Sequence, residues 1–322
     1  MYKNVLIVGL GGIGYRHFQA VLKCKSDIIL YAVDISKEAI ERARNYQLEI
    51  GFNKDVFFYY DINKIRNMSF DVAIIATSSK DRKKIFENIL KNANTVHNII
   101  FEKVLFNDLN DYEAVKKLLS DSGATAYVNC TGRENKDYQK LKQRIKNAKY
   151  YKFSYRGSNW GLACNSIHKI DMIAFLTNYT GKSVELDGSL LENQIYESKR
   201  KGYSEFYGSF SGKMGENITF VFECDHDDNE CIFDIYTDKG FYSIREGKEV
   251  IVHEGEYFKS EPFELEYVSD TSTVVVDNLL NERTIFLPGY EESVNYHMAM
   301  LKMFLDLQNN LTGKNSSICD IT

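Results

Sequence analysis

The sequence is poor in proline and in cysteine. Only Pro262 and Pro288 occur among the 322 residues, which excludes collagen-like structure and disordered proline-rich linkers. The six cysteines are too few and too irregularly spaced for a disulfide framework, so we expect a protein of the reducing cytoplasm. No apolar run reaches the roughly 18 residues of a membrane helix, and the N-terminal apolar stretch lacks the cleavage site of a signal peptide.

An excess of positive charge is also missing. The formal net charge is −5 and the pI is about 5.8, so the chain lacks the basic footprint of a nucleic-acid-binding protein. Hydrophobic residues make up 44% of the chain, which is enough for a sizeable core, and the length predicts about two domains. We therefore expect a globular protein with neither nucleic acid nor membrane as a partner.

Up to residue 130, short apolar runs alternate with segments of helical spacing. The apolar runs cover residues 5–10, 28–34, 57–60, 72–77, 98–103 and 125–130, and helical spacing occurs at 15–23, 36–46, 80–90 and 109–119. Several runs are continuous, as in strands that are buried on both faces of a parallel sheet. The sequence therefore predicts an α/β fold whose N-terminal domain is a doubly wound parallel sheet.

After about residue 150 the pattern changes. A helical segment follows Asn165, and short runs rich in aromatic and β-branched residues then alternate with Gly, Asp and Asn turns. These runs predict a C-terminal α+β domain with a largely antiparallel sheet. A last helix is expected at about residues 291–311, with the option of packing back on the first domain. We place the two domains at residues 1–123 and 124–322.

The strongest local signal is Gly9-Leu10-Gly11-Gly12-Ile13-Gly14, which follows a predicted strand and opens a predicted helix. In a dinucleotide-binding Rossmann turn, such glycines allow the tight turn, the close approach of a pyrophosphate and the packing of helix on strand. Unpaired N–H groups at the helix start attract the phosphates. We therefore predict that Gly9, Gly11, Gly12, Ile13 and Gly14 bind a dinucleotide. The alternative is a glycine turn without a ligand.

Asp34 ends the second predicted strand, twenty residues after Gly14. A carboxylate at this place accepts hydrogen bonds from the ribose hydroxyls of the cofactor and repels a 2′-phosphate, so NAD is favoured over NADP. NADP stays open because Lys37 follows closely and could meet a 2′-phosphate. The alternative for Asp34 is a cap or turn residue before the next helix.

At this point the sequence resembles the Gfo/Idh/MocA oxidoreductases, which include glucose–fructose oxidoreductase and inositol dehydrogenase. Four places carry the resemblance along nearly the whole chain. They are the glycine turn followed by Tyr15-Arg16-His17, Ala76-Thr77 after the fourth strand, Phe101-Glu102-Lys103, which resembles the family's Glu-Lys-Pro motif, and Cys164-Asn165-Ser166-Ile167-His168-Lys169-Ile170-Asp171, which resembles its Asp-x-Gly-x-His-x-x-Asp helix.

The resemblance implies a Rossmann domain, a nicotinamide cofactor, a sugar-like or cyclitol substrate and an active site between the domains. It places Lys103 near the nicotinamide and the reacting carbon, with His168 facing it from the second domain. Thr77, Ser78 and Glu102 would lie beside the cofactor. It also implies that the C-terminal sheet is open and forms the oligomer contact, so we expect a homodimer or homotetramer.

Three departures from the family pattern matter. Val104 replaces the motif's proline; since a cis bond before a non-proline residue costs about 2.5–4 kcal/mol, we predict a trans Lys103–Val104 bond, or a strained one that marks function. Cys164 stands where many relatives carry an aspartate, and the neighbouring Asn165 either substitutes as a hydrogen-bonding group or caps the helix. Arg82 occupies roughly the place of a histidine in relatives.

Oxidation of a secondary alcohol needs a group that takes the hydroxyl proton while hydride passes to the nicotinamide. Lys103 suits this role if its surroundings favour the neutral amine, and His168 suits it because the intrinsic pKa of a histidine side chain is about 6.5. Cys164 cannot replace an aspartate at neutral pH without activation. Lys103 and His168 are therefore the predicted catalytic pair. The alternatives are a solvated surface lysine and a histidine held near a helix start.

Further residues are expected at the substrate. Asn129 and Arg133 follow the sixth strand and contact substrate or cofactor, or anchor a loop. Trp160 beside polar groups suits a sugar, although buried packing suits it equally. Asp171 shares a helix face with His168 and either orients it, lines the sugar pocket or caps a backbone group.

Two charged segments complete the prediction. Residues 198–202 are a basic run, interpreted as a solvated loop or as a diphosphate contact of a nucleotide sugar. Residues 224–231 are interpreted as an acidic hairpin turn rather than a metal site, so no metal is expected.

The sequence thus predicts an NAD(H)-dependent oxidoreductase that acts on a CH–OH carbon of a sugar, with a nucleotide sugar of surface-polysaccharide biosynthesis as one option. Two alternatives remain. One is an epimerase or redox glycosidase that uses tightly bound NAD transiently, and the other is a non-catalytic NAD-binding protein. Fold analogy does not decide among them.

Overall fold

The computed structural model describes residues 2–51, 54–181 and 183–322. The chain forms two compact units. The first comprises the chain up to Phe106 together with Asn110–Thr131 and Glu266–Tyr290, and the second comprises Asn107–Leu109, Gly132–Leu265 and Glu291–Thr322.

A parallel six-stranded sheet is the centre of the first unit, with strand order β3-β2-β1-β4-β5-β6. Its strands are β1 (Lys3–Val8), β2 (Ile28–Val33), β3 (Val56–Tyr59), β4 (Ser69–Ile75), β5 (Thr95–Phe101) and β6 (Thr125–Val128). The order reverses between β1 and β4, and ligands of such sheets bind outside the carboxyl ends of the strands at this point. The predicted doubly wound sheet is confirmed.

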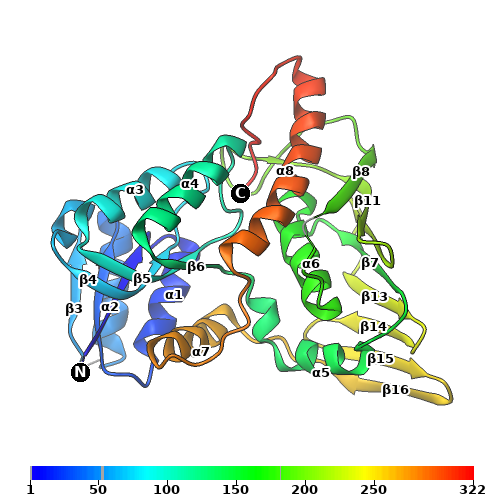
Figure 1. The fold of residues 1–322 in the computed structure, drawn as a ribbon, viewed down its shortest axis with the longest axis horizontal. Helices are drawn as coiled ribbons and strands as arrows, with labels where there is room; N and C mark the ends of the chain where they lie inside the picture. The colour runs from blue at the N-terminus through cyan, green and yellow to red at the C-terminus, as the bar shows by residue number, and fades with distance from the viewer. Residues whose placement is uncertain (1, 52–53, 182) are drawn as a thin grey trace. The chain divides into compact units, whose positions relative to one another are not determined.

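Helices cover both faces of this sheet. They are α1 (Gly12–Leu22), α2 (Lys37–Glu49), α3 (Arg82–Asn92), α4 (Leu109–Ser122) and α7 (Val268–Leu280), with a short 3₁₀ helix, η1, at Ile62–Ile65. One hydrophobic core joins α1, α2 and α7 to the sheet through buried side chains such as Phe18, Ile40 and Val275. Figure 1 shows α3 and α4 on the opposite face. The side chains on both faces of β1 are therefore buried, which explains its continuous apolar run.

The second unit contains an eight-stranded mixed sheet with the order β16-β15-β14-β13-β7-β12-β11-β8. Only the β7–β12 pair is parallel among the paired strands described for this sheet. The strands are β7 (Tyr151–Ser158), β8 (Val184–Leu191), β11 (Gly208–Met214), β12 (Ile218–Asp225), β13 (Ile232–Thr237), β14 (Phe241–Arg245), β15 (Glu249–Glu254) and β16 (Tyr257–Pro262), and β9 (Tyr196–Glu197) pairs separately with β10 (Ser204–Glu205). The largely antiparallel prediction is confirmed.

The two faces of this sheet differ. Helices α5 (Lys136–Ile145), α6 (Leu162–Thr177) and α8 (Tyr290–Thr312) belong to this part of the chain, preceded by the 3₁₀ helix η2 (Thr131–Glu134). Phe210 of β11 packs edge-on against Phe304 of α8, so one face is covered. β12 alternates strictly between buried and exposed residues, with Val221 on the exposed side. Such alternation is expected for an antiparallel sheet with one solvated face.

The expected hairpin at residues 224–231 is wrong. β12 and β13 do not pair with each other, because β7 lies between them and bonds to both. Phe153 of β7 stacks on Phe233 of β13, with 5.8 Å between ring centroids. The segment therefore crosses the end of β7, which the sequence analysis had not counted as a strand.

The compact units divide the chain at other positions than residue 123, and the predicted domain boundary itself stays a prediction. β6 forms a parallel ladder with β5, and α7 packs against α1, so both segments cluster with the first sheet. From Glu291 onward, α8 clusters with the second unit.

Two further properties concern the helices and the cysteines. None of the helices in the described ranges is long and apolar enough to cross a lipid bilayer. The six cysteines are all free thiols.

Candidate functional site

The glycine turn joins β1 to α1, and its glycines serve two different purposes. Gly9 has a φ of +91°, and a Cβ built on Gly14 would lie 1.9 Å from the carbonyl oxygen of Gly9. The fold itself therefore requires glycine at these two positions. A Cβ on Gly11 or Gly12 would meet no described atom within 4 Å, so these two glycines border open space.

The open space lies at the start of a helix. α1 begins at Gly12, and neither a side-chain cap nor an acidic residue in the first turn is found among its described residues. The first backbone N–H groups of a helix attract phosphate, and the missing Cβ atoms of Gly11 and Gly12 allow close approach. This cradle, which includes Ile13, fits the diphosphate of a dinucleotide.

Asp34 directly follows β2 and contacts this turn. Its Oδ2 accepts a hydrogen bond of 2.5 Å from the N–H of Leu10, and its Oδ1 accepts one of 2.7 Å from the N–H of Ser36. Each carboxylate oxygen has two acceptor sites, so both retain one for a ribose hydroxyl. The structure thus brings Asp34 to the glycine turn, where the cofactor prediction needs it.

Arg42 of α2 also reaches the glycine turn, and the sequence analysis missed it. Its Nη2 donates to the carbonyl oxygens of Leu10, at 2.5 Å, and Gly11, at 3.3 Å. The guanidinium lies over the ring of Tyr15, 4.5 Å from its centroid. The sequence could have indicated this contact, because Arg42 belongs to the helix that follows Asp34. The arginine does not follow Asp34 directly.

Thr77 and Ser78 follow β4 on the other side of the turn. The Cγ2 atom of Thr77 would lie 3.0 Å from a Cβ on Gly9, so the two residues are in contact. The buried Oγ1 of Thr77 has no hydrogen-bond partner among the described residues, which leaves it available to a ligand. Ser78 instead donates to Asp81 Oδ2 at 2.8 Å, just before α3 begins.

Glu102 is the centre of a buried hydrogen-bond network after β5. Its Oε1 lies 2.6 Å from His17 Nε2 and accepts a 2.6 Å hydrogen bond from Asn129 Nδ2. Burial raises the pKa of Glu102, but the hydrogen bond and charge of His17, helped by Arg82 and Lys103, outweigh it and leave the pKa below its ordinary value. The carboxylate is therefore ionised at neutral pH. Glu102 was expected at the cofactor and Asn129 at the substrate. The two residues are hydrogen-bonded to each other through Oε1 of Glu102.

Lys103 follows Glu102 directly and is half-buried. The peptide bond between Lys103 and Val104 is cis, so the expectation of a trans bond is wrong. The guanidinium of Arg82 is buried and donates to the carbonyl oxygens of Thr77, Val104 and Leu105. Arg82 thus joins the segment after β4 to the segment that carries Lys103.

In the second unit, α6 carries His168, which is half-buried. Asn165 donates to the carbonyl oxygen of Trp160 at 2.6 Å, and the indole Nε1 of Trp160 donates to the carbonyl oxygen of Glu223 at 2.8 Å. Two predicted substrate residues therefore lie together at the start of α6. Asn165 holds the chain that enters the helix by this bond, but it does not cap α6: the N-cap position is Gly161, and no side-chain cap is found there among the described residues.

Glu205 of β10 also reaches the start of α6 and was not foreseen. Its Oε1 accepts hydrogen bonds from the N–H of Ala163, at 2.6 Å, and of Phe206, at 3.0 Å. Burial raises its pKa, although hydrogen bonds from Phe206, Ala163 and Cys164 oppose this rise. Glu205 is thus a carboxylate beside Cys164, the position where the family pattern has an aspartate.

Arg133 and Asp171 form a buried ion pair. Arg133 donates through Nε to Asp171 Oδ2 at 2.8 Å and through Nη2 to Oδ1 at 2.6 Å, and Nη2 also donates to Glu292 of α8 at 2.7 Å. Burial raises the pKa of Asp171 to about 6, although the Arg133 charge acts in the opposite direction. These two predicted substrate residues therefore engage each other.

Lys103 belongs to the first unit and His168 to the second. Their pairing at one reacting carbon stays a prediction.

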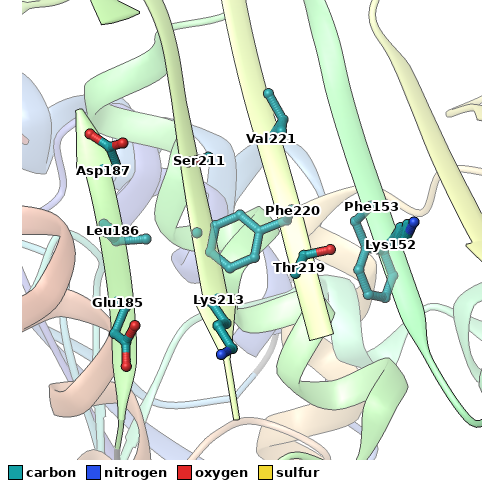
Figure 2. A pocket seen from close by; sticks show the side chains of 11 residues that line it. Lys152, Phe153, Glu185, Leu186, Asp187, Ser211, Lys213, Thr219, Phe220 and Val221 are labelled. Carbon is teal, nitrogen blue, oxygen red and sulfur yellow. The ribbon is translucent and has the colours of Figure 1, made fainter. Parts of the chain in front are cut away.

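A hollow of about 550 Å³ lies elsewhere, on the sheet of the second unit (Figure 2). It is lined by side chains of both charges, among them Lys152, Lys213, Glu185 and Asp187. None of the predicted site residues lines it.

Comparison with known proteins supports the dinucleotide site. Residues 3–130 match the family model described as "Oxidoreductase family, NAD-binding Rossmann fold", that of the Gfo/Idh/MocA proteins. This match covers the glycine turn, Asp34, Thr77, Glu102 and Lys103. No protein of curated function matches the sequence.

Several solved structures share the fold along nearly the whole chain. An oxidoreductase from Agrobacterium radiobacter in complex with NAD⁺, L-tartaric acid and magnesium has a TM-score of 0.71 at 14% identity, covering 96% of this chain and 97% of that one. A scyllo-inositol dehydrogenase from Lactobacillus casei with NAD(H) and scyllo-inositol has a TM-score of 0.67 at 16% identity (96% and 98% covered). A UDP-N-acetylglucosamine 3-dehydrogenase from Acidithiobacillus ferrooxidans has a TM-score of 0.67 at 13% identity (97% and 99% covered).

Proposed function

Because residues 3–130 match the NAD-binding domain model of the Gfo/Idh/MocA oxidoreductases, we propose that the protein transfers hydride to or from a hydroxyl-bearing carbon of a sugar. One option for this sugar is a nucleotide sugar of surface-polysaccharide biosynthesis. The observation that carries the proposal is the cradle at Gly11 and Gly12, which borders open space at the start of α1. Asp34 suits the ribose, and the buried Oγ1 of Thr77, which has no hydrogen-bond partner in the described part of the chain, suits the cofactor backbone.

In this proposal the bound dinucleotide supplies the hydride acceptor or donor, and residues of the chain handle the proton. Lys103 accepts the hydroxyl proton when the substrate is oxidised and returns it when the substrate is reduced. His168 is the second acid/base group. The Glu102 network and Arg82 fix the backbone on both sides of Lys103, which reduces the freedom of its amine before substrate binds.

A sugar-like substrate is supported by two of the similar structures. One is a dehydrogenase of scyllo-inositol and the other a dehydrogenase of UDP-N-acetylglucosamine. The indole of Trp160 is suited to pack on a sugar ring, and Asn165 lies beside it. The other proposed substrate residues are Asn129, Arg133 and Asp171. Asn129 is hydrogen-bonded to Glu102, and Arg133 and Asp171 are paired with each other.

We further propose a cytoplasmic homodimer or homotetramer that associates through the sheet of the second unit. Its solvated face carries exposed apolar side chains such as Val221, Tyr236 and Phe258, and the hollow in Figure 2 adds charges of both signs. The six free thiols agree with a reducing compartment.

The decisive test removes the Lys103 amine. We expect Lys103→Ala to lower turnover at least about a hundredfold on any sugar or nucleotide sugar oxidised by the wild type, since general-base catalysis contributes about that much. The dissociation constant of NAD should change less than threefold. Lys91→Ala, at the exposed end of α3, is the matched control.

NADH formation at 340 nm gives the turnover, and calorimetry gives NAD binding. Near-full activity of Lys103→Ala would contradict the assignment. Chemistry without net NADH, on a cofactor that stays bound, would favour the epimerase or redox-glycosidase alternative.

A further inference from the structure

Helix α6 is buried on nearly every side, and this affects how it can present His168. Eleven of its sixteen residues are buried, and the run from Ile170 to Leu176 is buried without interruption. A helix of this kind lacks the single apolar stripe that normally sets its rotation about its own axis. Specific polar contacts are one means by which such a buried element is held in a single arrangement.

Lys169, the residue after His168, makes a contact of this kind. Its Nζ donates to both carboxylate oxygens of Glu246, at 3.0 Å each, and lies 4.3 Å from the ring centroid of Tyr155 in β7. Only 12% of the Lys169 side chain is exposed. Glu246 belongs to the turn between β14 and β15 and also accepts a 2.5 Å hydrogen bond from the hydroxyl of Tyr138 in α5. Lys169 thus ties α6 to the sheet of the second unit and, through Glu246, to α5.

The Glu246 carboxylate is ionised at neutral pH. Burial raises its pKa, but the charge of Lys169 and the hydrogen bond from Tyr138 outweigh burial and leave the pKa below its ordinary value. Burial, together with the Glu246 charge, raises the pKa of Tyr138 well above its ordinary value, so the Tyr138 hydroxyl stays a donor. Both contacts of Glu246 are therefore charge-assisted hydrogen bonds, which are stronger than neutral ones.

A second ion pair holds α6 from another side, because Asp171 is paired with Arg133. Successive residues of an α-helix are turned by about 100° around its axis. Lys169 therefore points about 100° to one side of His168, and Asp171 about 60° to the other. The two ion pairs flank His168 on the circumference of the helix.

We propose that Lys169 is a positioning residue, whose ion pair with Glu246 fixes the rotation of α6 and thereby the direction in which His168 is presented. This inference rests on the proposed function, in which His168 is an acid/base group. Lys169 does not transfer the proton itself, because Glu246 and the ring of Tyr155 hold its amine. Loss of the pair turns His168 out of its working direction and leaves the dinucleotide site of the first unit unchanged.

The test is a double-mutant cycle with His168. Lys169→Met alone would strand the Glu246 carboxylate, so the probe is Lys169→Met/Glu246→Gln, which replaces the ion pair by neutral groups. Glu246→Gln alone keeps an acceptor for Lys169 and gives the same cycle in a milder form. The probe, His168→Ala and the triple variant are compared for kcat on a sugar or nucleotide sugar that the wild type oxidises. Urea denaturation checks that each variant is folded, and Lys140→Met, which removes an exposed lysine of α5, is the matched control.

We expect the probe to lower kcat about tenfold, because a small displacement of a reacting group is costly, and to change the Kd of NAD less than about threefold. In the His168→Ala background the same two substitutions should lower kcat less than about twofold, because the group that they position is gone. Lys169→Arg should retain at least about half of the wild-type kcat, since a guanidinium binds a carboxylate through two hydrogen bonds. Lys140→Met should leave kcat unchanged.

Equal losses of kcat in both backgrounds would overturn the inference, because a general loosening of the protein lowers activity whether or not His168 is present. A probe with the kcat of the wild type would overturn it as well. If His168→Ala itself kept full activity, the role of His168 in the proposed function would be refuted, and the inference built on it would fall with it.

Discussion

The two units of the protein use their candidate site residues in opposite ways. In the first unit, Gly11 and Gly12 leave open space, and Asp34 retains acceptor sites beside it. In the second unit, Arg133 and Asp171 satisfy each other. A site formed by backbone shape stays available to a ligand, whereas a site assigned to charged side chains can already be occupied by a neighbouring charge of the same chain.

The largest expected effect concerns the ion pair of the second unit. Arg133→Ala should lower the free energy of unfolding by about 3–5 kcal/mol, because it strands the buried carboxylate of Asp171. Urea denaturation measures the change, and the exposed Arg200→Ala serves as control. The double variant Arg133→Met/Asp171→Leu should recover most of the loss. A loss below about 1 kcal/mol in the single variant would contradict a structural role for the pair.

The glycine turn offers a sharper contrast within the first unit. Gly14→Ala should destabilise the protein by roughly 1–3 kcal/mol, because the new Cβ overlaps the Gly9 carbonyl. Gly12→Ala should leave stability unchanged or raise it by about 0.4–1 kcal/mol, yet weaken NAD binding at least about tenfold, because its Cβ projects into the phosphate space. Urea denaturation and calorimetry measure the two effects. Unchanged NAD affinity in a stable Gly12→Ala protein would place the diphosphate elsewhere.

The two buried carboxylates should give opposite pH dependences of stability. The pKa of Glu102 is lowered by folding, so its contribution is present above the unfolded value of about 4.3 and is lost as the pH falls further. The pKa of Asp171 rises from 3.8 to about 6, so the folded state binds the extra proton and stability falls by roughly 3 kcal/mol as the pH rises across that range.

Urea denaturation at a series of pH values tests both signs. Glu102→Gln should remove the loss of stability below about pH 4, and Asp171→Asn should flatten the decline between about pH 4 and 6. Exposed Glu113→Gln is the control. The measured quantity is the slope of the free energy of unfolding against pH. If the curves of wild type and variant were parallel, the pKa shift assigned to that carboxylate would be refuted.

Short-range patterns predicted the first sheet, while long-range packing decided the elements that the sequence analysis missed. The β-branched run Val274–Val276 in α7 is typical of a strand, yet Val275 and Val276 are buried in the core shared with α1, and this packing overrides local propensity. The sequence analysis missed β16 because most of its residues are exposed and it ends at Pro262. Proline is tolerated in this strand because β16 lies at the edge of the sheet.

The candidate site shows the same division. Gly9–Gly14 and Asp34 are close in the sequence, and their roles follow from backbone geometry, so the sequence was sufficient to bring them together. The contact from Arg133 to Glu292 spans 159 residues, and the one from His17 to Glu102 spans 85. A single sequence carries no signal for such pairs, because each partner is a common residue type in an ordinary helix or strand end.

The carboxylate of Glu205 has a consequence for engineering. Gly161 opens α6 in a left-handed conformation with a φ of +81°, without a capping side chain of its own among the described residues. The N-terminus of this helix, which carries His168, is instead capped by Glu205, a residue more than forty positions downstream that accepts a hydrogen bond from the N–H of Ala163. Anyone who exchanges the connection between β8 and β11 to retarget this scaffold would have to transplant an acidic residue at position 205, or rebuild the first turn of α6.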